Sequence, residues 1–164
     1  MEGQNRMQER NRMEEQEKME ADMMAAIADV NEKQAAIVNG MMKPEFAGCS
    51  FEEKTLTLRF PVMDWERNRA GSMHGGMIGA AFDIGMGFLA RYLTGKNFLP
   101  TISLETVFIR PIFVGDALIV NVKANFYGQS LIHLYGEGYL EGSGKLAATV
   151  TASYLNKDTS AQDR

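Results

Sequence analysis

The segment 75–93 constrains the fold more than any other part of the chain. Gly, Ala, Met, Ile, Phe and Leu occupy most of its positions, so a helix over these residues is apolar on nearly every face. Such a helix has to be buried. Residues 55–60 before it, and the chain from Leu99 onward after it, have strand patterns. The economical arrangement is a sheet that wraps around one central helix.

Alternating apolar and polar residues predict one strand at 55–60 and four more after the central helix, at about 99–109, 117–127, 130–140 and 144–155. Short breaks that contain glycine, such as Gly128-Gln129-Ser130, separate the later segments and suit hairpins. The sheet is therefore expected to be mainly antiparallel, which makes this an α+β protein.

The N-terminal region has the apolar spacing of one helical face, in steps of three, four and seven residues, at Met19, Met23, Ile27, Val30, Ile37 and Met41. Asn39-Gly40 is a stop signal, so a helix is expected from about 12 to 39. It lies in a charged extension at 1–40, which precedes the main domain at 41–157 and a disordered tail at 158–164. The helix either packs on its own domain or a partner subunit, or forms a coiled-coil arm.

Charge and composition argue against several classes of protein. Seventeen basic residues face 21 acidic ones, whereas a nucleic-acid binder needs a basic surface. No stretch approaches the ~20 apolar residues that span a bilayer, and the charged start is unlike a signal peptide. One cysteine, Cys49, and two histidines leave little for a disulfide framework or a metal site. We expect a cytoplasmic protein without nucleic-acid or membrane partners.

One acidic residue, Asp83, interrupts the apolar helix. A buried carboxylate is costly unless it is paired or hydrogen-bonded, and enzymes use such groups in catalysis. Gly75 and Gly76 begin the helix, where free backbone N–H groups and the positive end of the helix dipole can bind an oxyanion. The alternatives are a solvated or salt-bridged Asp83, a tight turn at the glycines, and a capping or core role for His74.

Helix geometry separates these two groups. Asp83 lies eight residues after Gly75, which is roughly 12 Å along the axis at about 1.5 Å per residue. One helix cannot bring its own Asp83 to an anion at its own N-terminus. A two-fold dimer with antiparallel central helices would place Asp83 of one subunit beside Gly75 of the other. If both groups serve one reaction, the protein must be a homodimer.

The set Asn68-x-x-Gly71-x-x-His74-Gly75-Gly76, with Asp83 nine residues after the histidine, resembles the PaaI-like acyl-CoA thioesterase family of the hotdog-fold superfamily. The segment from Thr101 to Pro111, followed by Gly115-Asp116, is similar to the next strand and turn of that family. The resemblance covers about 45–155. It implies a hotdog fold, with five or six antiparallel strands around the central helix, in dimers or tetramers. The N-terminal helix is an addition to that fold.

The resemblance also implies an activity, the hydrolysis of an acyl-CoA thioester to free acid and CoA, without a metal or a cofactor beyond the CoA of the substrate. Asp83 matches the catalytic acid, as nucleophile or general base, and the Gly75 amide matches the oxyanion donor. Asn68 and His74 match side chains that orient the carbonyl or the water, and Thr101 a hydroxyl that positions the water. The expected substrate-binding residues are Gly76, Met77 and Phe82.

Several features leave alternatives open. Gly85 and Gly87 lie inside the helix, where they allow close approach across the dimer or make room for an acyl chain. Ile78 and Phe88 are further candidates for the acyl tunnel, and the candidates for binding the CoA phosphates are Arg67, Arg69, Arg91 and Arg110. The competing functions are an acyl-CoA sensor without catalysis, and a dehydratase or hydratase that uses a histidine, either His74 or His133, with a carboxylate.

Overall fold

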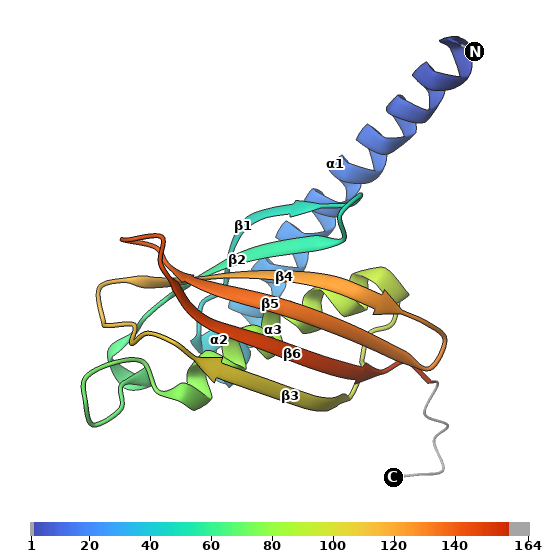
Figure 1. Cartoon of the computed structure of the whole chain (residues 1–164). Coiled ribbons are helices and arrows are strands. Elements are labelled where there is room, and N and C mark those ends of the chain that lie inside the picture. The colour runs from blue at the N-terminus through green and yellow to red at the C-terminus, as the bar shows by residue number, and fades with distance from the viewer. Residues whose placement is uncertain (1, 158–164) are drawn as a thin grey trace.

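The structure is a computed structural model that describes residues 2–157. Six antiparallel strands form one sheet, in the order β1-β2-β4-β5-β6-β3, that curves around a long helix, α3 (Figure 1). The predicted antiparallel sheet around a central helix is confirmed, with six strands. The elements are α1 (Glu2–Lys33), α2 (Val38–Met41), β1 (Glu45–Ser50), β2 (Thr55–Pro61), the 3₁₀ turn η1 (Asp64–Glu66), α3 (Gly75–Thr94), β3 (Thr101–Phe108), β4 (Ala117–Tyr127), β5 (Leu131–Leu140) and β6 (Leu146–Leu155).

Helix α3 packs closely on the sheet because β5 has glycines beneath it. A Cβ atom on Gly136 would lie 2.9 Å from the Phe82 ring, and one on Gly138 would also lie 2.9 Å from that ring. The fully buried Phe82 fills this space. The side of α3 that carries Gly79 and Asp83 is only half-buried in the single chain. The expectation that this helix is buried on all faces is therefore not met on this side of the single chain.

The edge strand β1 was not predicted from the sequence. It is six residues long, and its register to β2 shifts between Phe46 and Gly48. Gly48 has a φ of 154°, a backbone conformation that side-chain-bearing residues rarely adopt. A bulge in so short a strand removes the regular alternation on which strand prediction depends.

Helix α1 differs from the predicted helix at both ends, because it spans Glu2–Lys33 and is followed by the separate turn of α2. Met19, Met23, Ile27 and Val30 are buried as expected, but Ile37 and Met41 are exposed. Gly40 allows α2 to fold back, since a Cβ there would lie 2.3 Å from the Gln34 carbonyl oxygen.

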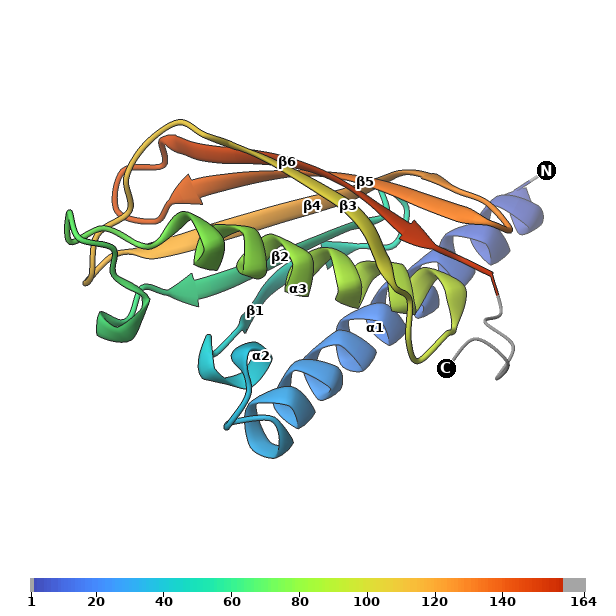
Figure 2. The ribbon, with the colours of Figure 1, turned by 90° about the horizontal axis from the view of Figure 1, so that it is seen from below.

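The two halves of α1 have different surroundings. Its C-terminal half packs beside the C-terminal end of α3, whereas its N-terminal half projects beyond the sheet (Figures 1 and 2). The tail expected at 158–164 lies outside the described residues. Within 2–157 no helix combines the length and the apolar character that a membrane crossing requires.

Candidate functional site

The loop before α3 is organised by Asn68. Its Oδ1 accepts hydrogen bonds from the backbone N–H groups of Ala70 (2.9 Å) and Ser72 (3.2 Å). Its Nδ2 donates to Ser72 Oγ over 2.9 Å. Asn68 lines a hollow beside Gly75 and Phe108, and Asp83 is not part of that hollow. Asn68 therefore holds the shape of the loop from which α3 begins.

Glu66 anchors the same loop from inside the protein. Its side chain is 1% exposed, and its Oε2 accepts a hydrogen bond from Met63 N–H over 2.8 Å. Its backbone carbonyl accepts a bond from His74 N–H over 2.7 Å. The other carboxylate oxygen, Oε1, has no hydrogen-bond partner in the part of the chain that the structure describes. Burial raises the pKa of Glu66, and the Met63 N–H partly offsets this effect.

We predict that Glu66→Gln stabilises the protein at neutral pH, by a few tenths to about 1 kcal/mol, because the amide is neutral and can keep the Met63 bond. A raised pKa in the folded state means that Glu66 favours folding below its unfolded pKa and loses that contribution as the pH rises through the folded value. The difference between variant and native protein should therefore shrink toward pH 4. Urea unfolding at pH 4 and pH 7 measures it; a destabilised variant at pH 7 would contradict the prediction.

His74 caps the N-terminus of α3. Its Nδ1 accepts a hydrogen bond from Gly76 N–H over 2.9 Å, so the Gly76 amide is occupied. The Gly75 N–H donates to no other residue in 2–157 and remains open to a ligand. A Cβ on Gly75 would lie 3.0 Å from the Phe108 ring, which shows how tightly this turn packs against β3. The predicted oxyanion donor is available, and His74 acts here as a cap.

The Asp83 carboxylate is held by two hydroxyl groups. Thr101 Oγ1 donates to Asp83 Oδ1 over 2.9 Å, and Tyr154 Oη donates to the same oxygen over 2.7 Å. The Tyr154 hydroxyl also lies 3.1 Å from the Asp83 carbonyl oxygen. Asp83 Oδ2 makes no hydrogen bond to any described residue. The arrangement fixes one carboxylate oxygen and leaves the other available for chemistry.

Tyr154 was missed in the sequence analysis. It is 2% exposed and stands beside Thr101 in the pairing of β6 with β3. Burial, and then the charge of Asp83, raise the pKa of Tyr154 well above its ordinary value, so its hydroxyl remains a neutral donor. The only signal in the sequence is the alternation of β6, in which a tyrosine ends an inward-facing row of Ala148, Val150 and Ala152.

We predict that Tyr154→Phe lowers turnover about tenfold, because one of the two donors that orient Asp83 is lost at a cost of about 1–2 kcal/mol. Thiol release from an acyl-CoA and thermal melting measure activity and stability together. The matched control is Tyr135→Phe on β5, whose hydroxyl bonds Glu137 and not Asp83. Equal losses of activity in both variants would mean that Tyr154 has no special role.

Asp83 lies in a groove between α3 and β3. The groove has a volume of about 480 Å³ and is lined by Gly75, Gly76, Gly79, Ala80, Asp83, Thr101, Leu104, Thr106 and Phe108. It brings four predicted site residues together, Asp83, Thr101, Gly75 and Gly76. Met77 lines none of the cavities described here, and Phe82 lies in the core against β5. The structure therefore places these last two expected substrate-binding residues away from the groove.

The four candidate arginines lie in different surroundings. Arg67 forms an ion pair with Asp64 over 3.1 Å, Arg69 is exposed, and Arg110 donates to the Leu146 carbonyl oxygen. Arg91 is half-buried at the C-terminal end of α3. The four do not gather at one place that would hold the CoA phosphates within a single chain. Among residues 2–157, no group of three or more His, Cys, Asp or Glu side chains is arranged to hold a metal ion.

Comparisons with known proteins agree with the fold. A family model described as Thioesterase superfamily matches residues 70–147. A phenylacetic acid degradation-related protein from Ralstonia eutropha JMP134 is 25% identical, with a TM-score of 0.66 over 79% of this chain and 98% of its own. PaaI from E. coli is 17% identical, with a TM-score of 0.67 over 80% and 89%. Zebrafish thioesterase superfamily member 2 is 15% identical, with a TM-score of 0.71 over 80% and 96%. No curated protein matches the sequence significantly.

The fold and the groove define a hotdog protein, in which an antiparallel sheet wraps around a helix that carries the site carboxylate. Within that class the chain is similar to the PaaI-like thioesterases, the family that its sequence motif resembles.

Proposed function

We propose that this protein hydrolyses an acyl-CoA thioester to the free acid and CoA, without a further cofactor. One observation supports this most: Thr101 and Tyr154 hold Asp83 through Oδ1, which leaves its Oδ2 free in a groove between α3 and β3. Relatedness to thioesterases supports the reaction class. The structure of smu.793 from Streptococcus mutans, which is 19% identical with a TM-score of 0.59, contains acetyl CoA, and this supports a CoA thioester as substrate.

The chemistry requires a negative charge on the thioester oxygen to be stabilised. In the proposed reaction the Gly75 N–H donates to that oxygen, a contribution of about 3–4 kcal/mol for one such donor. Asp83 Oδ2 either attacks the carbonyl carbon, giving an anhydride that water then cleaves, or takes a proton from the attacking water. In both routes the C–S bond breaks and CoA leaves as a thiolate, which is then protonated.

A homodimer is part of the proposal, because Gly75 and Asp83 of one chain stand roughly 12 Å apart along α3. Strand β3 is an unpaired edge of the sheet, and its Ile102 and Val107 are more than half exposed. Phe98, Phe108 and Phe113, which lie before, within and after β3 in the sequence, are also exposed. Unpaired edges and large apolar patches mark interfaces between chains. A tetramer would require a second interface.

The position of His133 favours hydrolysis over dehydration. His133 stands between the inward-facing Ile132 and Leu134 on β5, so it points to the outer face of the sheet. Its Nδ1 lies 3.2 Å from Ser153 Oγ, the neighbour of Tyr154 on the other face of β6. The sheet therefore separates His133 from Asp83 of its own chain.

Thiol release from a panel of short aliphatic, long aliphatic and arylacetyl-CoA substrates tests the proposal. We expect turnover of at least one class. If none of these thioesters is cleaved but acyl-CoA still raises the melting temperature, as a bound ligand does, the result would instead indicate a sensor that binds without catalysis.

A further inference from the structure

The site continues beyond Asp83, away from Gly75. Asp83 and Thr101 line both the groove described above and a second cavity of about 240 Å³ toward the C-terminal end of α3. The apolar walls of this second cavity are formed by Ile84, Phe88, Phe98, Leu99 and Pro100. An acyl group whose thioester carbonyl lies at Asp83 can enter this space.

Gly87 and Arg91 follow Asp83 at successive four-residue steps, so the three residues share one face of α3. A Cβ added to Gly87 would meet no atom within 4 Å, so this position leaves open space between the other two. The backbone of Arg91 lies eight residues after that of Asp83, roughly 12 Å along the helix, and the Arg91 side chain turns back to the Gly87 carbonyl oxygen. The cavity therefore begins at a carboxylate and ends at a guanidinium group.

The Arg91 guanidinium has no acidic partner in 2–157. Its Nε donates to the Gly87 carbonyl oxygen over 3.2 Å, and its Cζ lies 4.8 Å from the centre of the Phe88 ring. No described residue accepts a bond from its two terminal nitrogens. Burial lowers the pKa of Arg91, but an arginine keeps its charge at neutral pH. A half-buried cation without a counter-charge is costly, and a ligand anion would remove that cost.

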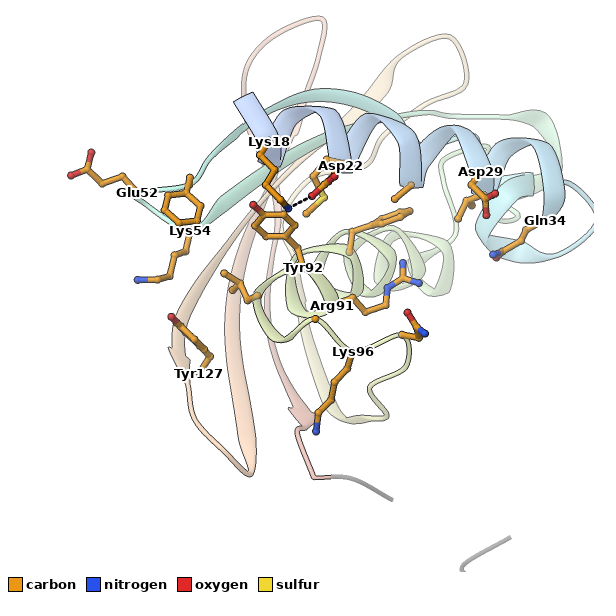
Figure 3. A pocket seen from close by; sticks show the side chains of 18 residues that line it. Lys18, Asp22, Asp29, Gln34, Glu52, Lys54, Arg91, Tyr92, Lys96 and Tyr127 are labelled. Atoms are coloured by element: carbon orange, nitrogen blue, oxygen red, sulfur yellow. Dashed lines mark hydrogen bonds and ion pairs between the residues drawn. The ribbon is translucent and has the colours of Figure 1, made fainter. Parts of the chain in front are cut away.

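Arg91 also lines a larger cavity of about 850 Å³ between α1 and α3 (Figure 3). The acidic residues around this larger cavity are each paired with a basic residue other than Arg91. Asp22 pairs with Lys18, Asp29 with Lys33, and Glu52 with Arg12.

We propose that Arg91 binds a carboxylate at the far end of the acyl chain, so that the substrate is an ω-carboxyacyl thioester of medium length. The proposal rests on the proposed function. Asn39 and Asn97 line the Asp83 cavity with Arg91, and their amides can donate further bonds to the same carboxylate. Hydrolysis then releases a dicarboxylic acid and CoA.

The test compares suberyl-CoA with octanoyl-CoA, two thioesters with equal chain length that differ in the terminal carboxylate. We expect native kcat/KM to be about 10- to 100-fold higher for suberyl-CoA, the range of one charge-assisted hydrogen bond. Arg91→Gln should remove this preference and spare octanoyl-CoA. The control is Arg10→Gln, on the projecting half of α1, which should keep the preference. The ratio of kcat/KM for the two substrates does not depend on how much of the enzyme is folded.

Each other outcome is decisive. Equal use of both substrates by the native protein would overturn the role of Arg91 and leave thioester hydrolysis intact. Equal loss of both in Arg91→Gln would show that the guanidinium acts on CoA or on the fold. If no thioester is cleaved, the proposed function fails, and melting curves with suberate and octanoate test Arg91 directly. Suberate should then raise the melting temperature of the native protein and not that of Arg91→Gln. If suberate leaves the melting temperature of the native protein unchanged, the inference is overturned.

Discussion

Replacing Asp83 by Asn should lower acyl-CoA hydrolysis by about 10²–10⁴-fold, the usual contribution of a general base or more. Asn has the same shape, and its amide oxygen can still accept the bonds from Thr101 and Tyr154. It can neither attack the thioester as a carboxylate nor take a proton from water. The rate of thiol release at saturating substrate measures the loss.

Two controls separate chemistry from folding in this experiment. Circular dichroism and size-exclusion chromatography should show the same fold and the same oligomer for Asp83→Asn as for the native protein. Acyl-CoA should still raise the melting temperature of the variant, because the groove is intact. A variant that keeps more than a tenth of native turnover would rule out Asp83 as the reacting group.

Placing lysines on the exposed edge of β3 should separate the subunits and remove activity. Ile102 and Val107 are 56% and 53% exposed in the single chain and line none of the cavities described above. In a dimer through this edge, the double change Ile102→Lys and Val107→Lys would bury unpaired charges, at a cost of several kcal/mol for each. We expect a monomer at micromolar concentration by light scattering, with turnover reduced at least about 100-fold, since a missing oxyanion donor alone costs about that much.

The control for this pair is Met24→Lys, which adds a lysine at a similarly exposed apolar residue of α1 and should leave dimer and turnover unchanged. A β3 variant that is monomeric and fully active would show that one chain contains the complete site. A variant that remains dimeric would place the interface elsewhere.

The sequence alone determined the elements with regular periods. The central helix and the strands β4, β5 and β6 were predicted within two residues of their bounds, because burial on one face leaves a period of 3.6 or 2 in the sequence. The lone acid in an apolar helix and the glycines at its start marked Asp83 and Gly75 as candidates, and Thr101 followed only from the resemblance to a known family. Where local irregularity interrupts the period, as at Gly48 in β1 or between α1 and α2, the prediction missed the strand or the break.

Only the tertiary structure decided which side chains surround Asp83. Tyr154 reaches it across 71 residues of sequence, through the pairing of β6 with β3, and no local pattern records such a contact. Phe82 precedes Asp83 yet packs in the core, where the glycines of β5 make space for its ring. The unpaired charge of Arg91 depends in the same way on which elements pack around it. Periodicity encodes which face of an element is buried, whereas packing determines what that face meets.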